Sequence, residues 1–413
     1  MSAPAVVALP WADPLSDARL SRELGERYFV WDAFVAGQRR VDLHPLVLPA
    51  ALHAQAVAAA EGVAAAIALV GARAHVDAGE RERYAFDDDV LALAAASHAA
   101  GDVATLVRVD LLLDETGTFR ACEVNADCPG GHNEATGLPR LARLAGHAAD
   151  VDPTHVLASL AARLAELSEG RAVGLLYATA YAEDLQVCAL IQRALAARGV
   201  DAILAPPTAP RLRGGRLCIG DVPLGALYRF FPTEGMVGQR NVRDVAAAIA
   251  RGEVRSMSSF GAMFAQSKLA MARAWADVSA LPAPLAHAVR AHLPSTFDVA
   301  DCPRAALLAD RAGWVLKRAL GRVGDEVFVG TLWDAQDWSS VVDRVLTLRE
   351  AGDAWIAQRF VRQRAIATPW GPRLVTLGAY VEGGRFAGYF ARLTTESHVS
   401  HDAMCVPVFA EAA

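Results

Sequence analysis

The sequence contains very little lysine and asparagine. Of its 40 basic residues only Lys268 and Lys317 are lysines, and the asparagines are Asn125, Asn133 and Asn241. An Ala- and Arg-rich chain of this kind suggests a biased genome, in which lysine persists mainly where arginine cannot replace it. Arginine carries its charge on a bulky planar fork, whereas lysine offers a compact point charge. Both lysines are therefore candidates for a functional site, although two surface lysines could also survive by chance.

An excess of positive charge is also missing, since 40 basic residues face 46 acidic ones and the net charge is −6. This balance argues against a general affinity for nucleic acid or for an anionic membrane. The longest apolar stretch, residues 46–74, is interrupted by polar residues and suits a packed helix better than a membrane span. The first residues lack a basic segment followed by an apolar one, so we expect no signal peptide. The six cysteines form no CxxC pair and indicate reduced thiols in a cytoplasmic protein.

Common catalytic signatures are absent from the sequence. We find no GxxxxGK[ST] loop, no GxGxxG fingerprint, no HExxH and no GxSxG. The chemistry must therefore come from other elements.

The pattern of elements predicts a mixture of α/β and α+β structure in three parts. Residues 1–150 contain helical stretches and a hairpin. Residues 151–255 alternate strands and helices, which is typical of an α/β unit with parallel pairing. Residues 256–413 contain a helix with Lys268 and several strands, which predicts an α+β region around a largely antiparallel sheet.

The hairpin, TLVRVDLLLD and FRACEVNAD joined by a turn, carries the strongest candidate for a metal site. Side chains alternate along a strand, so Arg108 and Asp110 share one face, as do Glu123 and Asn125. Carboxylate and amide oxygens suit Mg²⁺, which takes one or two carboxylates together with nucleotide phosphates and water. The alternative is a solvated face with ordinary cross-strand ion pairs.

The other candidates lie in the last part of the chain. Lys317 ends an apolar strand before the turn LGRVG, where it could contact phosphate oxygens while backbone N–H groups approach them. Gln358 lies in the strand WIAQRFV, which could stack under a base, and Arg392 ends GYFARL, in position for a phosphate or an oxyanion. Each of these, like Lys268, also has an ordinary surface or hairpin interpretation.

Together these elements resemble a known family. RVDLLLDETGTFRACEVNADCPGGHNEA resembles the R-x-D…E-x-N-A-D-x-P element of glutathionylspermidine synthase and its relatives, and AQSKLAMARAW and VLKRALGRVGDEV resemble their lysine segments. The resemblance spans roughly residues 108–407. The metal carboxylates precede the lysines, as in this circularly permuted group of ATP-grasp enzymes. The resemblance implies a permuted ATP-grasp fold with a preATP-grasp-like α/β substrate domain at residues 151–255.

The resemblance also implies roles for individual residues. The catalytic pair, which would hold a phosphorylated carboxylate or the γ-phosphate, is Arg108 and Arg392. The Mg²⁺ ligands, expected for two ions, are Asp110, Glu123 and Asn125. The ATP-binding residues are Lys268, Lys317, Gly321, Gly324 and Gln358, with Gln358 beside the adenine. Residues near positions associated with an amine or peptide substrate are Glu234 and Asp402.

Some positions depart from the family pattern. Arg318 follows Lys317 where the family favours proline, and Arg392 is followed by Leu393 and Thr394 rather than acidic residues. Cys128 and two glycines replace a Thr-rich stretch, and we expect no counterpart of the amidase domain that some synthases carry. The nucleotide site is therefore better supported than glutathione or spermidine as substrates.

These observations predict a cytoplasmic, ATP-dependent ligase that joins a small-molecule or peptide carboxylate to an amine through an acylphosphate, with neither nucleic acid nor membrane as partner. Two alternatives keep the site: a small-molecule kinase, and a nucleotide-binding regulatory protein without turnover. A third, a zinc protein using Cys122, Cys128 and His132, is disfavoured because Cys122 alternates away from Glu123.

Overall fold

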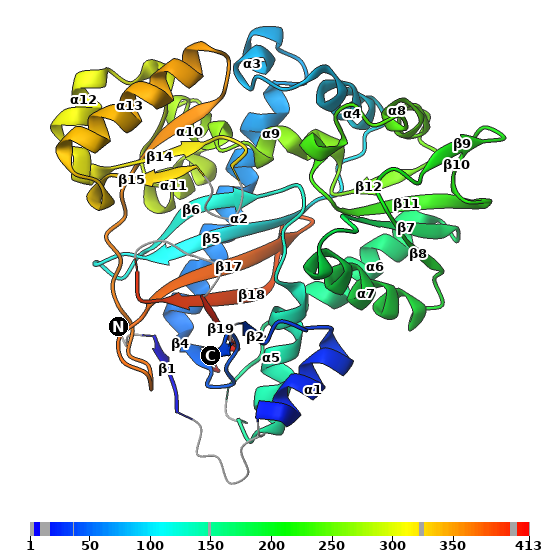
Figure 1. Ribbon diagram of the computed structural model, residues 1–413, viewed down its shortest axis with the longest axis horizontal. Coiled ribbons are helices and arrows are strands. Elements are labelled where there is room, and N and C mark those ends of the chain that lie inside the picture. The colour runs from blue at the N-terminus through cyan, green and yellow to red at the C-terminus, as the bar shows by residue number, and fades with distance from the viewer. Residues whose placement is uncertain are drawn as a thin grey trace.

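The computed structural model describes residues 4–8, 17–35, 37–147, 150–321, 326–396 and 403–412. Three larger sheets organise the described chain (Figure 1), and most of the helices pack against them. The mixed α/β and α+β fold predicted from the sequence is confirmed, whereas the division into three residue ranges stays a prediction.

The central sheet has five antiparallel strands in the order β19-β18-β17-β5-β6. Its strands are β5 (Leu106–Leu113), β6 (Phe119–Asn125), β17 (Leu374–Glu382), β18 (Arg385–Thr394) and β19 (Met404–Val406). The predicted hairpin β5–β6 is therefore confirmed, with Gly117 in the turn at a φ of 82°. The hairpin pairs along β5 with β17, so segments from opposite ends of the sequence form one sheet.

One face of the central sheet is apolar and covered by the helix α2 (Ala50–Arg73). Alternation along β5 directs Val107, Val109 and Leu111 into the core with α2. It also directs Arg108 and Asp110 to the opposite face. Of the described helices, α2 alone is long and apolar enough to cross a membrane, but half of its most apolar window is buried inside the molecule, as expected for a packed core helix.

A second antiparallel sheet lies beside β6, in the order β13-β16-β14-β15 (Figure 1). Its strands are β13 (Thr296–Asp298), β14 (Trp314–Arg318), β15 (Val327–Val329) and β16 (Trp355–Arg359). The helices α12 (Arg304–Ala309) and α13 (Ala335–Glu350) pack on it. The prediction of one antiparallel sheet for the last part of the chain was wrong, because β17 and β18 pair with the hairpin and not with these strands.

The third sheet has the order β8-β7-β11-β10-β9, with β12 also paired to β11. Its strands are β7 (Ala172–Tyr177), β8 (Ala202–Ala205), β9 (Arg211–Arg213), β10 (Arg216–Ile219), β11 (Val222–Phe230) and β12 (Arg255–Met257). The predicted parallel pairing is confirmed for β7 with β8 and β11. The helices α6 (Val156–Ser168) and α7 (Ala182–Ala196) pack with residues of one face and α8 (Val242–Ala250) with residues of the other.

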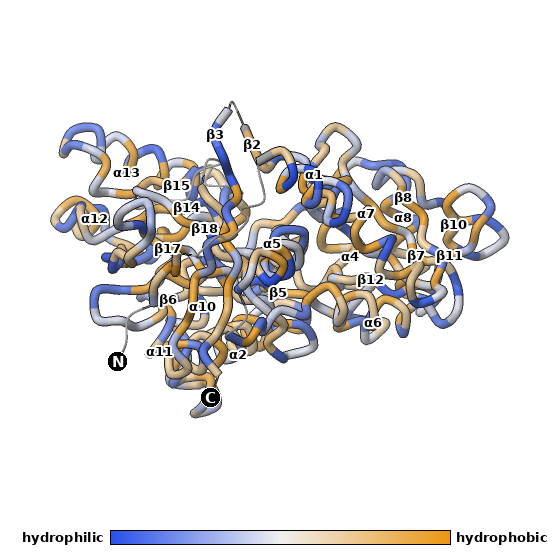
Figure 2. The backbone as a smooth tube through the Cα atoms, turned by 90° about the horizontal axis from the view of Figure 1, so that it is seen from below, coloured by the Kyte–Doolittle hydropathy of each residue, from blue (hydrophilic) through white to orange (hydrophobic). Residues whose placement is uncertain are grey.

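Smaller elements complete the described chain. The strands β1 (Ala5–Val6), β4 (Leu46–Leu48) and β20 (Val408–Ala410) form one sheet, and β2 (Phe34–Val35) and β3 (Gln38–Arg39) another. The remaining α-helices are α1 (Asp17–Tyr28), α3 (Ala78–Arg83), α4 (Asp88–Ala99), α5 (His132–Leu144), α9 (Met263–Gln266), α10 (Leu269–Ala276) and α11 (Ala283–His292). Five short 3₁₀ helices are η1 (Thr233–Met236), η2 (Phe260–Ala262), η3 (Val299–Asp301), η4 (Arg311–Gly313) and η5 (Gly330–Leu332). Figure 2 shows that the peripheral α1 and β3 are largely hydrophilic.

Candidate functional site on the hairpin

Asp110 lies on the face of the central sheet that is opposite α2, with 2% of its surface exposed. Arg108 donates to both of its carboxylate oxygens, from Nε at 2.6 Å and from Nη2 at 3.0 Å. Arg392 of β18 donates to Oδ2 from Nη2 at 2.7 Å. Burial alone would raise the pKa of Asp110, but the two guanidinium groups outweigh it and hold the pKa below its ordinary value. The two arginines predicted to act together therefore converge on one carboxylate.

Glu123 reaches the same face because β6 contains a bulge. Asp110 is opposite Glu123, but Leu111 is opposite Ala121, so no residue of β5 lies directly opposite Cys122 in the register. With strict alternation Glu123 would share the α2 face with Ala121, which is fully buried in that core. The extra residue turns Glu123 towards Asp110 and Asn125 towards Arg108.

Lys268 binds Glu123 directly, with 2.8 Å between Nζ and Oε1. The helix predicted at Lys268 is α10, of which Lys268 is the N-cap; α9 ends before it at Gln266, and Ser267 between them is extended. The backbone N–H of Lys268 donates to Ala319 O and its Nζ to Gly321 O at 2.7 Å. Lys268 is 4% exposed, so the interpretation as a solvent-facing lysine is wrong. Burial would raise the pKa of Glu123, and Lys268 is the main group that lowers it below its ordinary value.

Lys317 links the two antiparallel sheets. Its Nζ donates to Cys122 O on β6 at 2.9 Å and to Gln358 Oε1 on β16 at 2.8 Å. The bulge explains the first contact, because it removes Cys122 from the regular hydrogen-bond ladder of the hairpin. Burial lowers the pKa of Lys317, and the nearby Glu123 partly restores it. The side chain of Gln358 also donates to Thr296 Oγ1 at 3.1 Å, a partner that nothing in the sequence pattern indicated.

The donor set of the hairpin fits a hard cation such as Mg²⁺. Asp110 and Glu123 are cross-strand neighbours, and Asn125 Nδ2 is buried with no partner among the described residues. The nitrogen and oxygen of an Asn amide can be exchanged by rotating the group. In the rotated orientation the Asn125 oxygen takes the place of the unpaired nitrogen, where it can bind a cation. Within the described ranges no three His, Cys, Asp or Glu side chains converge on a metal, so the zinc alternative with Cys122, Cys128 and His132 gains no support.

The loop after β6 is fixed by residues whose role the sequence did not reveal. Gly130 O accepts from Arg108 Nη1 at 2.9 Å and from the Tyr380 hydroxyl at 2.6 Å. Asp127, in the NAD segment of the motif, forms an ion pair with the fully buried Arg229 of β11 at 2.9 Å. It also accepts from the backbone N–H of Thr233 at 2.9 Å and from its hydroxyl at 2.8 Å. The loop thereby links the site to the sheet that contains β11. Asp127 has a structural role there and is not a metal ligand.

Two titratable groups lie at the start of α5, which follows this loop. His132 is fully buried, and neither ring nitrogen has a partner among the described residues. Burial, with a smaller contribution from Arg108, lowers its pKa to about 3. Burial raises the pKa of Glu134 to about 7. The imidazole is therefore neutral at physiological pH.

The remaining predicted residues are Glu234, Gly321, Gly324 and Asp402, of which Gly321 contacts the cluster. Glu234 is half-buried in η1, directly after Thr233, so its segment reaches the site through Asp127. Gly321 contributes its carbonyl to Lys268. Gly324 and Asp402 lie outside the described residues.

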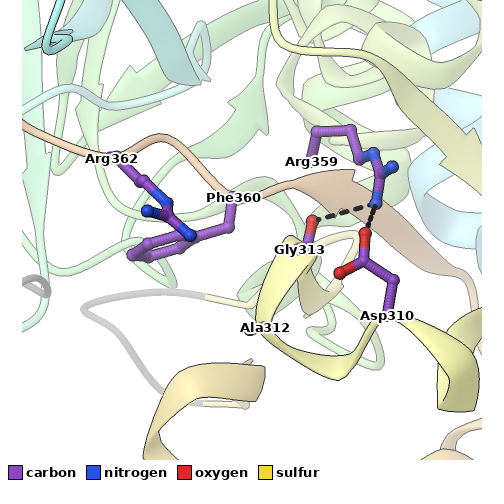
Figure 3. A pocket seen from close by; sticks show the side chains of 6 residues that line it. All are labelled: Asp310, Ala312, Gly313, Arg359, Phe360 and Arg362. Carbon is purple, nitrogen blue, oxygen red and sulfur yellow. Dashed lines mark hydrogen bonds and ion pairs between the residues drawn. The ribbon is translucent and has the colours of Figure 1, made fainter.

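A surface pocket of about 270 Å³ lies at the C-terminal end of β16, and none of these charged residues lines it. Figure 3 shows Arg359 bridging the Asp310 carboxylate and the Gly313 carbonyl, with Phe360 and Arg362 beside it. Arg359 alternates away from Gln358 along the strand. The pocket is therefore separate from the chemistry of the hairpin.

The sequence matches a known protein family. A family model described as glutathionylspermidine synthase preATP-grasp matches residues 44–410. The chain belongs to this family. Membership points to a ligase of the synthetase type that acts on small molecules. A search of curated protein sequences finds no significant match.

Solved structures extend the comparison at the level of fold. A glutathione synthetase-like effector from Globodera pallida, in its apo form, superposes with a TM-score of 0.58 at 13% identity, covering 95% of this chain and 97% of the other. A putative gamma-glutamylcysteine synthetase from Methylobacillus flagellatus has a TM-score of 0.44 at 14% identity, over 78% and 83% of the two chains. The first similarity supports the family's fold, and the second is too weak to carry an argument.

Proposed function

We propose that this family member is an ATP-dependent carboxylate–amine ligase that forms an amide through an acylphosphate and releases ADP and phosphate. The observation that carries the proposal is the convergence of the only two lysines on consecutive residues of β6. Lys268 contacts the carboxylate of Glu123, and Lys317 contacts the carbonyl of Cys122. Two compact cations beside a pair of carboxylates are the arrangement expected for a nucleotide triphosphate and its metal.

The charge balance of the cluster supports a polyanionic ligand. Its four cations are Arg108, Arg392, Lys268 and Lys317, and its two anions are Asp110 and Glu123, so the sum is four minus two, or +2. Lys268, Asp110, Arg108 and Lys317 are each at most 9% exposed. Buried charge of one sign is costly without a counter-ion. Phosphate groups would supply that counter-charge.

The metal ligands would be Asp110, Glu123 and Asn125. When bound, Mg²⁺ would offset the negative charge of the transferred phosphoryl group. Before that, Lys268 holds the carboxylate of Glu123 and the two arginines hold that of Asp110. These cations keep both carboxylates ionised and therefore ready to ligate.

The same side chains have a second task once a metal binds the carboxylates. Lys268 and Lys317 would turn their ammonium groups to the phosphates, and Arg108 and Arg392 would hold the substrate carboxylate or the phosphoryl oxygens. Fixed cations that meet developing negative charge stabilise the transition state, and loss of one costs roughly 10²–10³ in rate. The amine would then attack the activated carboxyl group, in a site that must exclude water.

The substrates would be a small-molecule or peptide carboxylate and an amine, with Glu234 and Asp402 near the amine. We also propose a cytoplasmic location, which the scattered cysteines, with no CxxC pair in the sequence, support. Family membership does not favour a kinase or a regulatory protein without turnover.

The test is an ADP-release assay over peptides, amino acids and polyamines, with the products separated by ion-exchange chromatography. We expect ADP, phosphate and an amide in equal amounts. AMP with pyrophosphate would overturn the acylphosphate mechanism. A phosphorylated product without amide would identify a kinase, and ATP binding without turnover on any pair would favour the regulatory protein.

A further inference from the structure

The side-chain amide of Gln358 is occupied at both ends by other protein groups. Its Oε1 accepts from Lys317 Nζ at 2.8 Å, and its Nε2 donates to Thr296 Oγ1 at 3.1 Å. The residue is 2% exposed and Thr296 is fully buried. In this arrangement each end of the Gln358 amide therefore has a protein partner.

The register of the sheet explains why these three side chains meet. Thr296 on β13 is directly opposite Gln358 on β16. Gln358 is in turn opposite Val315 on β14, and Lys317 lies two residues further along that strand, on the same face. Opposite and diagonal neighbours on one face of a sheet are within reach of long polar side chains. Thr296, Gln358 and Lys317 therefore form a row of hydrogen-bonded side chains across three strands. The row ends at Cys122 O on the central sheet.

The chemistry of the three groups fixes the direction of the hydrogen bonds. An ammonium group only donates, so the end of the Gln358 amide that faces Lys317 must be its oxygen. The nitrogen then faces Thr296, whose hydroxyl donates to Pro294 O at 2.7 Å and accepts from the amide. The carbonyl of Pro294 also accepts from the indole of Trp275 at 2.6 Å. Because its hydroxyl proton is directed to Pro294 O, Thr296 accepts from the amide nitrogen and so supports the orientation that the ammonium requires.

Cys122 O and Gln358 Oε1 hold the ammonium of Lys317 from the two sheets. Among the described residues these two acceptors take two of its three N–H donors. The third donor remains for a phosphate oxygen. Without Gln358, the ammonium would keep one protein acceptor and a wider range of positions.

We propose that Gln358 is a positioning residue for Lys317, that Thr296 orients it, and that the Gln358 side chain does not read the adenine base. This proposal rests on the proposed nucleotide function and refines the prediction that Gln358 lies beside the adenine. It assigns the row a role in phosphate binding and leaves base recognition to other groups.

The test measures binding of ATP, ADP, AMP, adenosine and GTP by titration calorimetry to the wild type, Thr296→Val, Thr296→Ser and Gln358→Leu. Thr296→Val keeps the shape of the side chain and removes the hydroxyl, whereas Thr296→Ser keeps the hydroxyl. A matched control is Gln192→Leu, which removes a comparable amide contact to Ala202 O in the parallel sheet. Unfolding of each variant without nucleotide checks the fold.

Gln358→Leu should weaken ATP binding by about tenfold, the range of one lost hydrogen bond to a charged group, and Thr296→Val by about two- to tenfold, the range of one lost neutral hydrogen bond. AMP and adenosine affinities and the ratio of ATP to GTP affinity should stay at the wild-type value. Thr296→Ser and Gln192→Leu should bind ATP as the wild type does. A general structural defect would weaken all ligands alike, so the selective loss with polyphosphates identifies positioning.

Two results would overturn the proposal. Weaker adenosine binding and a lost preference for ATP over GTP in Gln358→Leu would show that the amide reads the base. Unchanged ATP affinity in Thr296→Val and Gln358→Leu would show that the row has no functional role. A wild type that binds no nucleotide would instead refute the nucleotide function itself, so the two failures are distinguishable.

Discussion

Replacement of Lys317 by arginine keeps the charge and changes the shape of the cation. The ammonium lies between Cys122 O and Gln358 Oε1, at 2.9 and 2.8 Å, and the side chain is 9% exposed. A planar guanidinium is longer and wider than this position. Insertion of a larger group into a packed site usually destabilises a protein by about 1–3 kcal/mol. We therefore expect Lys317→Arg to unfold at a lower temperature even without nucleotide.

The larger effect should be on nucleotide binding. A ligand present at about 100 times its Kd stabilises the folded state by about 2.7 kcal/mol, or roughly 5 °C in a domain that gains about 2 °C per kcal/mol. A misplaced cation forfeits a charge-assisted contact of about 1.5–3 kcal/mol, which lowers affinity by about 10–100-fold. At a hundredfold loss the stabilisation falls to about 0.4 kcal/mol, or less than about 1 °C.

The assay is differential scanning fluorimetry with and without Mg²⁺-ATP, in which each variant is compared with its own nucleotide-free baseline. Lys268→Arg should lose most of the ATP-induced rise as well, and Lys317→Arg should lose more because two neutral acceptors enclose it. Arg304→Lys, an exchange of the same two residue types in an exposed ion pair with Asp343, should keep the full rise. If both buried lysine variants kept the wild-type rise, the assignment of the lysines to phosphate would be refuted.

Three further predictions concern the same face of the sheet. Asp110→Asn and Glu123→Gln should each abolish amide formation. Asp110→Asn should also lower the free energy of unfolding by about 3–5 kcal/mol, because two arginines lose their buried partner. Turnover near the wild-type rate in the double variant would exclude the hairpin as the metal site. The pKa of Asp110 is lowered in the folded state, so its contribution to stability is present above the unfolded pKa of about 4 and is lost as pH falls below it. In urea titrations, the free energy of unfolding of Asp110→Asn should therefore fall less steeply at acid pH than that of the wild type. Folding lowers the pKa of His132 from 6.5 to about 3, so the unfolded state binds the proton first and stability should fall by about 2 kcal/mol between pH 6.5 and 5. His132→Phe should remove that part of the decline, and identical pH profiles would contradict burial of a neutral imidazole.

The sequence singled out the two lysines, and the structure shows how deeply they are buried. Their rarity singled them out because Arg and Lys differ in shape, and both lie at the hairpin. Sequence pattern did not indicate that they are nearly fully buried, since Lys268 fell in a helical pattern that is broken at Ser267. Burial makes the exchange to arginine costly for folding as well as for binding.

The sequence by itself determined the local elements and the candidate ligands. Alternation of polar and apolar residues predicts the hairpin and the shared face of Arg108 and Asp110, because the period of two is a local property of a strand. Turn residues such as Gly117 have the same local origin. The order of carboxylates and lysines along the chain was sufficient to suggest the family.

Tertiary structure alone decided which distant groups meet. The bulge at Cys122 turns Glu123 to the face of Asp110 and makes the Cys122 carbonyl an acceptor for Lys317, and a bulge depends on pairing with the neighbouring strand. The pairing of β17 with both β5 and β18 brings Arg392 to Asp110, and the pairing of β13 with β16 brings Thr296 to Gln358. No local pattern encodes these contacts, because each is set by the register between strands that are far apart in the sequence.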